Sequence, residues 1–290
     1  MTFNFGKELE SIFYNLTKHM NYPFYEQELF TKLQDSLIIM NRLRPPKIKY
    51  NTTLVHGGRS QVTFISTKGW VVSGAYKKSK AGRVRRELAD AFYLIYDEIK
   101  SEARYFLMQY KKEEDIARMI GGEFEAELLQ HELFSSNISF KYKGKNYNFL
   151  MSPKVKSITS YGVFYTKGNH YDMLYASSDI IKPKIIPCSS CKSTVSVDTS
   201  QMNLLRNSRT PYEDYAGVPS IEQFGNALID LKIGEPIDFK LAKSLSDSIK
   251  GLKNSNFIDN KNNENNFLIQ MAYNSKNIIV ISISNEINDL

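Results

Sequence analysis

Three polar residues of the chain are of the types that together can bind a metal ion and a phosphate. Asp90 carries a carboxylate, Gln109 an amide and Lys111 a cation. Carboxylate and amide oxygens are hard ligands that suit Mg²⁺ or Mn²⁺. The bound ion polarises a phosphodiester and lowers the pKa of a water, while a lysine holds that water or offsets the charge that develops on the phosphate. This combination predicts metal-dependent phosphodiester hydrolysis if the fold brings the three residues together.

Two short apolar runs, residues 91–96 and 105–108, lie between Asp90 and Gln109. Both runs are rich in aromatic residues and a polar connector separates them, which predicts two antiparallel strands of a hairpin. Asp90 directly precedes the first apolar run and Gln109 directly follows the second, so the hairpin would bring them to the same end of a sheet. Because side chains alternate along a strand, Lys111 is expected on the same face as Gln109.

Two further groups beside this hairpin are candidate members of the site. We expect the main-chain carbonyl of Tyr110 to complete a metal site with Asp90 and Gln109, because it is another hard oxygen. Glu87 stands three residues before Asp90, and we expect it to bind a second ion or to orient the attacking water.

The sequence around the hairpin resembles the PD-(D/E)xK nuclease superfamily, in the variant where glutamine replaces the acid before x-Lys. Residues 86–90 (RELAD) and 107–112 (LMQYKK) are similar to the ELxD … LxQxK signature of bacterial restriction-endonuclease-like proteins linked to phage defence. The resemblance covers about residues 54–142. It implies that Asp90, Gln109 and Lys111 form the core of the site and that Glu87 assists them. Glutamine in place of an acid removes one negative charge, so a weaker metal site is expected.

A cluster of cations directly precedes the candidate site in a chain whose formal net charge is +7. No acidic residue interrupts it between residues 77 and 86. Such a cluster predicts contacts with the phosphates of a nucleic acid, and a solvated basic loop is the alternative. Its members are Lys77, Lys78, Lys80, Arg83, Arg85 and Arg86.

The composition predicts a folded chain with a substantial core, since 42% of its 290 residues are hydrophobic. No run approaches the roughly 18–20 apolar residues that span a bilayer. The first residues lack the apolar stretch of a signal peptide, so a cytoplasmic protein without membrane contact is expected. The predicted class is α/β, with a mixed central sheet flanked by helices as a restriction-endonuclease-like core. Residues 1–150 are expected to form this core, and residues 151–290 an α+β elaboration that is separate or packed on it.

Apolar spacing along the rest of the chain predicts further helices and strands. Helices are expected over residues 7–20, 25–43, 123–134, 221–231 and 239–252. Strands or hairpins are expected over residues 62–65, 138–150, 160–176 and 277–284. Residues 201–215 are polar and are expected to form a loop.

The sequence gives less reason to assign other residues with reactive side chains to the site. His56 can contact a phosphate or transfer a proton, but no pattern places it near the hairpin, and a structural role is expected. Residues 130–132, Gln-His-Glu, are expected on a helix surface. Cys188 and Cys191 have zinc-knuckle spacing, but a tetrahedral zinc site needs four ligands and the sequence has no second such pair.

The function expected from these features is Mg²⁺- or Mn²⁺-dependent DNA endonuclease activity in restriction or phage defence. Two identical sites in a homodimer would be the simplest way to cut both strands of a duplex, and other proteins of a defence system are expected partners. Three alternatives stay open. They are a catalytically weak or inactive nucleic-acid-binding protein on the same fold, a ribonuclease, and an interaction module with a metal site at Cys188 and Cys191.

Overall fold

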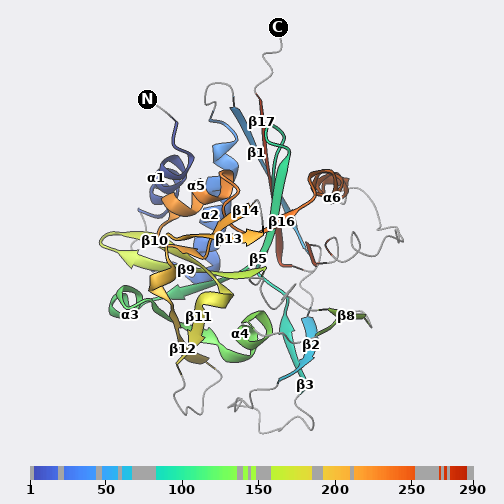
Figure 1. The fold of residues 1–290 in the computed structure, drawn as a ribbon. Coiled ribbons are helices and arrows are strands. Elements are labelled where there is room, and N and C mark those ends of the chain that lie inside the picture. Colours follow the sequence, from blue (N-terminus) through green and yellow to red (C-terminus); the bar gives the residue numbers. More distant parts are fainter. Residues whose placement is uncertain are drawn as a thin grey trace.

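An eight-stranded mixed sheet forms the centre of a computed structural model of the chain (Figure 1). Its strand order is β1–β17–β4–β5–β9–β10–β15, and β16 also pairs with β5. The pairs β17–β4 and β5–β9 are parallel, and the other pairs are antiparallel. The structure describes residues 3–18, 23–43, 48–57, 61–66, 83–135, 140–142, 145–147, 158–184, 192–209, 212–251, 268, 271–272 and 275–285.

The strands of the central sheet are β1 (Ile48–His56), β4 (Ala91–Asp97), β5 (Glu102–Glu113), β9 (Thr159–Lys167), β10 (His170–Ser177), β15 (Gly217–Val218), β16 (Glu235–Ile237) and β17 (Asn277–Asn285). Three smaller sheets have the orders β3–β2–β7–β8, β11–β12–β6 and β13–β14. Their strands are β2 (Gln61–Ile65), β3 (Arg83–Glu87), β6 (Glu123–Glu127), β7 (Phe140–Tyr142), β8 (Lys145–Tyr147), β11 (Ile181–Pro183), β12 (Lys192–Val197), β13 (Leu205–Arg209) and β14 (Tyr212–Tyr215).

Six α-helices and two short 3₁₀ helices are described around these sheets. They are α1 (Phe5–Thr17), α2 (Glu26–Met40), α3 (Ile116–Ile120), α4 (Leu128–Ser135), α5 (Ile221–Ile229), α6 (Phe239–Gly251), η1 (Ser178–Ile180) and η2 (Thr199–Gln201). None of these described helices is long and apolar enough to cross a membrane.

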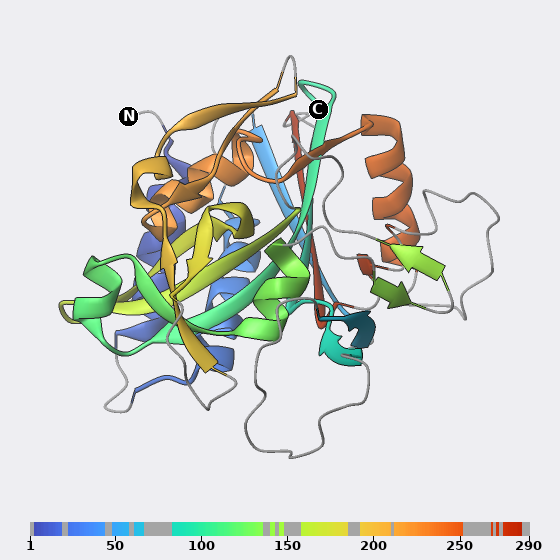
Figure 2. The same ribbon diagram turned by 60° about the horizontal axis from the view of Figure 1, so that its bottom comes forward.

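Both faces of the central sheet are buried, which explains the continuous apolar composition of its inner strands. All 7 residues of β4 are buried. Tyr93 and Ile95 point into one core cluster, and Phe92 and Leu94 into the other, as the alternation of strand side chains requires. The first cluster includes residues of α1, α2 and α5, and the second includes residues of α4 and α6. Figures 1 and 2 show α1, α2 and α5 on one side of the sheet and α6 on the other.

The hairpin expected from the two apolar runs is present. β4 and β5 pair antiparallel, from Ala91 opposite Met108 to Asp97 opposite Glu102. Helices α1, α2, α5 and α6 overlap the helices expected there, and β17 overlaps the expected late strand. The α/β class with a mixed central sheet and flanking helices is therefore confirmed.

Three local expectations are wrong. Residues 123–134 do not form one helix, because Glu123–Glu127 is the strand β6 and the helix α4 begins at Leu128. In β6, Phe124 and Ala126 are buried while the glutamates are more exposed, and this period of two belongs to a strand. Residues 130–132 are buried rather than on the helix surface. The polar residues 201–215 include the antiparallel pair β13–β14 instead of a loop alone.

Segments from both sides of residue 150 share the central sheet. β9 lies parallel to β5, and β10 follows β9 as an antiparallel neighbour. β17, the last described strand, lies between β1 and β4. The later part of the chain therefore contributes strands to the sheet that carries the β4–β5 hairpin.

Candidate active site

Asp90 and Gln109 meet at one end of the β4–β5 hairpin. The register pairs Ala91 with Met108, and the Asp90 N–H donates to the Met108 carbonyl oxygen at 3.1 Å. Asp90 Oδ2 accepts hydrogen bonds from Gln109 Nε2 and from the Tyr110 N–H, the latter at 2.9 Å. Asp90 and Gln109 are each only 7% exposed, so the contact is largely shielded from water.

The main-chain carbonyl of Tyr110 lies on the same edge of β5 as Asp90. Met108 is the last residue of β5 that pairs with β4, and β5 itself continues to Glu113. The N–H and C=O of one strand residue point to the same edge. Because the Tyr110 N–H donates to Asp90, the Tyr110 carbonyl oxygen faces the same side. This orientation keeps the oxygen a candidate metal ligand.

The Tyr110 ring anchors this part of β5 in the core. It stacks on Phe30 of α2, with ring centroids 4.2 Å apart, and on Phe164 at 5.4 Å. Its hydroxyl lies 2.5 Å from the Tyr93 hydroxyl. Gly162 of β9 leaves room for the ring, since a Cβ there would lie 2.9 Å from Tyr110 Cε1. Burial of a large apolar side chain stabilises a fold by roughly 1.5–3 kcal/mol, so the ring fixes the main chain on either side of it.

The pKa of Asp90 is raised to about 6. Loss of hydration on burial is the largest cause, and the carboxylate of Glu26 also raises the pKa. The Tyr110 N–H and the cations of Lys111 and Lys276 lower it. Functional sites commonly contain acids with raised pKa values, because such sites hold charged groups where burial disfavours them.

Helix α2 brings a second carboxylate that the sequence did not single out. Lys111 Nζ lies 3.5 Å from Glu26 Oε1. Glu26 is the first residue of α2 and lies one turn before Phe30 on the same helix face. Because Phe30 stacks on Tyr110, the start of the helix lies beside Lys111. The pair is partly exposed, at 22% for Lys111 and 40% for Glu26, and such pairs contribute only about 0–1 kcal/mol. Lys111 can therefore exchange Glu26 for a phosphate at little energetic cost.

Asn277, at the start of β17, holds the main chain of Asp90 from the neighbouring parallel strand. Its N–H and its Nδ2 donate to the Asp90 carbonyl oxygen at 3.0 and 3.3 Å. Asn277 Oδ1 lies 3.1 Å from His56 Nδ1, at hydrogen-bonding distance. His56 is therefore one side chain away from Asp90, a position that no sequence pattern indicated because β1, β17 and β4 are distant in the chain. Its role as a structural residue stays a prediction.

Glu87 lies at the end of β3, in the four-stranded sheet rather than in the central one. Its side chain is exposed, and its main-chain carbonyl accepts a hydrogen bond from Gln130 Nε2 at 3.2 Å. Among the described residues, no hydrogen bond or ion pair joins the Glu87 carboxylate to Asp90. Glu87 is thus near the site in sequence, but its carboxylate is not held against the other site residues.

The expected cluster of cations is described only in part. Lys77, Lys78 and Lys80 lie outside the described residues, and Arg83 is described as a strand position of β3 only. Arg85 is exposed on β3. Arg86 points to the other face, where its Nη2 lies 2.5 Å from Glu127 Oε1. Of the two described side chains, Arg85 is therefore the one free to meet a phosphate.

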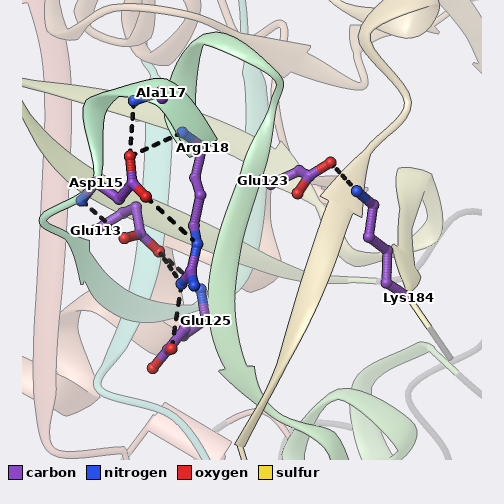
Figure 3. Close-up of polar contacts among 7 residues, drawn as sticks. All are labelled: Glu113, Asp115, Ala117, Arg118, Glu123, Glu125 and Lys184. Atoms are coloured by element: carbon purple, nitrogen blue, oxygen red, sulfur yellow. Dashed lines mark hydrogen bonds and ion pairs between the residues drawn. The ribbon is translucent and has the colours of Figure 1, made fainter. Parts of the chain in front are cut away.

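Glu113, on the same face of β5 as Lys111, has a structural role (Figure 3). Its carboxylate accepts hydrogen bonds from the Asp115 N–H at 2.9 Å and the Glu125 N–H at 3.1 Å. Arg118 adds ion pairs to Glu113, Asp115 and Glu125. These contacts tie the end of β5 to α3 and β6, so the strand that carries Gln109 and Lys111 is fixed beyond the site.

The oxygen atoms near Asp90 fit a hard divalent cation in kind. They belong to the carboxylates of Asp90 and Glu26, the amide of Gln109 and the carbonyl of Tyr110. No group of three or more His, Cys, Asp or Glu side chains suited to a metal occurs among the described residues. In the arrangement described, the Gln109 amide presents its nitrogen to Asp90. Shared ligation by these two residues requires the amide to turn so that its oxygen faces the ion.

No protein-family model, curated protein or solved structure matches this chain. The geometry around Asp90 and the motif resemblance are therefore the basis for a functional proposal.

Proposed function

We propose that this protein is a Mg²⁺- or Mn²⁺-dependent endonuclease that hydrolyses phosphodiester bonds of DNA. The observation that carries the proposal is the contact between Asp90 and Gln109 at the end of the β4–β5 hairpin, with Lys111 two residues further along β5. The spacing and the hairpin agree with a restriction-endonuclease-like core of the PD-(D/E)xK type. Fold, motif and a buried acid with a raised pKa support the same reaction class.

Asp90, the turned amide of Gln109 and the Tyr110 carbonyl would hold the metal ion, with Glu26 as a further carboxylate. The ion supplies Lewis-acid polarisation of the phosphate and a water of lowered pKa. Asn277 keeps the main chain of Asp90 in place through its two hydrogen bonds. The protein thus contributes oxygen ligands around Asp90, whose main chain is held in place and whose side chain is largely buried.

Lys111 would leave its ion pair with Glu26 when the substrate binds. Its ammonium group then orients the attacking water or offsets the negative charge that develops on the phosphate. Release of Glu26 at the same time leaves that carboxylate for the metal ion. Glu87 would take part only if its exposed side chain turns toward Asp90 in the substrate complex.

Cleavage of supercoiled plasmid DNA with Mg²⁺ or Mn²⁺ tests this proposal. Asp90→Asn keeps an oxygen acceptor for the Tyr110 N–H but removes the anionic ligand, so a loss of at least about 100-fold in rate is expected. Asp97→Asn is the matched control, because Asp97 is a buried acid at the opposite end of β4 whose Oδ1 accepts the Ile99 and Lys100 N–H groups. It should cleave like the wild type. Equal rates for the wild type and Asp90→Asn would refute the proposal.

A labelled RNA hairpin in the same reactions tests the ribonuclease alternative. The protein is assigned to DNA if the duplex DNA is cut and the RNA is not. Faster, metal-dependent cleavage of RNA that Asp90→Asn abolishes would keep the site but change the substrate.

A catalytically weak or inactive nucleic-acid-binding protein is the second candidate. The hydrogen bond from Gln109 Nε2 to Asp90 favours it, because this bond satisfies the carboxylate without a metal ion. Titration with Mn²⁺, followed by electron paramagnetic resonance, separates the candidates. An affinity that Asp90→Asn abolishes supports the enzyme, and DNA binding without any bound Mn²⁺ supports the inactive protein.

The biological setting remains part of the proposal. Restriction or phage defence, and cooperation with other proteins of a defence system, are proposed from the motif resemblance, and a cytoplasmic location is proposed with them. A homodimer would present two copies of the site to the two strands of a duplex. Sedimentation of the protein with and without DNA tests the dimer, and a monomer in both conditions would contradict it.

A further inference from the structure

The four-stranded sheet β3–β2–β7–β8 has one face on the core and one face toward solvent. Val62 and Phe64 of β2 are 0% and 2% exposed, and Val84 of β3 packs against the same core cluster. Side chains one position along each strand, such as Thr63 and Arg85, point to the opposite face. A sheet that covers the core with one face leaves the other face for solvent or a partner.

A row of polar side chains crosses this outer face, with one residue from each strand. The strand registers pair Arg85 with Thr63, Thr63 with Lys141, and Lys141 with Asn146. Arg85, Lys141 and Asn146 are exposed, and Thr63 is half-buried. The row therefore presents two cations and two neutral hydrogen-bonding groups, with no acid among them.

The spacing within this row suits successive phosphate groups. Neighbouring strands lie about 4.8 Å apart, so Arg85 and Lys141, which are two strands apart, are separated by roughly 10 Å. At this separation each cation can meet a phosphate of its own, and Thr63 lies between them. None of the four side chains is aromatic, which favours contact with a sugar-phosphate backbone over stacking on unpaired bases.

The row lies a short distance along the chain from the candidate active site. Arg85 precedes Asp90 by five residues, and five extended residues span at most about 18 Å. The next pair on the same face, Gln61 and Glu87, lies on the side of the row toward Asp90. Arg86 belongs to the other face, where it pairs with Glu127. In Figure 1 the small sheet, with β2, β3 and β8, lies at the opposite end of the molecule from α1 and α5.

We propose that the row Arg85–Thr63–Lys141–Asn146 binds the sugar-phosphate backbone of duplex DNA and leads it to Asp90. The choice of DNA rests on the proposed function, whereas the contact with phosphate follows from the row itself. Each cation that neutralises a phosphate releases counterions, and this release makes the affinity depend on salt concentration.

Fluorescence anisotropy with a short labelled DNA duplex in EDTA measures this contact without cleavage. The double variant Arg85→Ala/Lys141→Ala is expected to bind more weakly. The slope of log affinity against log salt concentration should fall in magnitude by about 1.8, which corresponds to two lost phosphate contacts at about 0.9 each. Lys141→Arg keeps the charge and should keep the wild-type slope. Both residues are on the solvent face, and thermal unfolding shows whether the variants keep the native fold.

The matched control is Lys182→Ala/Lys184→Ala, which also removes two cations. These lysines pair with Asp198 and Glu123, next to a different sheet, and their loss should leave the slope unchanged. A wild-type slope in the Arg85/Lys141 double variant overturns the proposal. The proposal is also overturned if the double variant changes the slope for single-stranded DNA or duplex RNA by as much as, or more than, it changes the slope for duplex DNA. If Asp90→Asn loses cleavage but binds the duplex as the wild type does, the row is supported as a binding surface separate from the catalytic residues. If the row binds DNA but the wild type does not cleave it, the proposed nuclease activity is refuted and the proposal for the row stands.

Discussion

Asn277 donates two hydrogen bonds to a single atom, the main-chain carbonyl oxygen of Asp90. One comes from its main chain, as part of the parallel pairing of β17 with β4, and the other comes from its side chain. The side chain therefore fixes the position of Asp90 without touching the carboxylate. It is a positioning residue whose effect on the reaction must pass through Asp90.

Asn277→Ala removes the side-chain bond and keeps the main-chain bond. We expect the free energy of unfolding to fall by about 1 kcal/mol, a typical value for one hydrogen bond. We expect kcat for plasmid cleavage to fall about tenfold with little change in KM, because Asp90 shifts while the surface that meets DNA is unchanged. Asn285→Ala, at the exposed far end of β17, is the control and should change neither. A kcat equal to that of the wild type would show that Asn277 has no positioning role.

His56 and Asn277 are expected to act as a unit. The His56 ring nitrogen Nδ1 lies 3.1 Å from Asn277 Oδ1, so His56 orients the amide that holds Asp90. A double-mutant cycle with His56→Ala and Asn277→Ala, read from denaturant unfolding, should give a coupling energy of about 0.5–3 kcal/mol. Strictly additive effects would mean that the two side chains are independent in solution.

The pH dependence of stability should show the raised pKa of Asp90. The pKa is about 6 in the folded protein, and about 3.9 is expected in the unfolded chain. Since the folded state holds the proton to higher pH, the contribution of Asp90 to stability falls as the pH rises from about 4 to 6. The fall is about 3 kcal/mol and levels off above the folded pKa.

Asp90→Asn removes this titration and keeps an acceptor for the Tyr110 N–H. In EDTA, its free energy of unfolding relative to the wild type should therefore increase between pH 4 and pH 7. Urea unfolding at several pH values measures the difference. Parallel curves for the two proteins would contradict a raised pKa at this position.

Gln109→Glu should raise the affinity of the site for a metal ion and lower the stability of the metal-free protein. The amide now donates to Asp90, whereas an ionised glutamate would place two carboxylates side by side in a largely buried site. We expect Mn²⁺ to bind at least about tenfold more tightly and the free energy of unfolding in EDTA at pH 8 to fall. Gln223→Glu, an exposed change on α5, controls for net charge. An unchanged Mn²⁺ affinity in Gln109→Glu would argue that residue 109 is not a ligand.

The sequence predicts the part of the site that depends on local pattern. Two aromatic-rich runs with a polar connector identify the β4–β5 hairpin, and the hairpin alone brings Asp90 to Gln109. A period of two in residues 123–127 was also present in the sequence, but the longer apolar spacing suggested a helix there. Glutamates at alternate positions were the signal for β6.

The rest of the site depends on contacts between distant segments. Asn277 reaches Asp90 only because β17 pairs parallel with β4, and His56 follows through the pairing of β1 with β17. Glu26 is placed by the stacking of Phe30 on Tyr110. Side-chain period shows that a strand or helix has a buried face, but it does not identify the neighbour that covers this face. These residues therefore could not be assigned to the site from the sequence alone.

Adjacent lysines on β5 provide the most direct test of the proposed nuclease. Lys111 is paired with Glu26 beside Asp90, whereas Lys112 pairs with Glu114 and lies over the Tyr171 ring. Single-turnover cleavage of a DNA duplex with Mg²⁺ should be at least about 100-fold slower for Lys111→Ala than for the wild type. Lys112→Ala, which removes the same charge one residue away, should stay within a few-fold of the wild type. Equal rates for the two variants would contradict a catalytic site built from Asp90, Gln109 and Lys111.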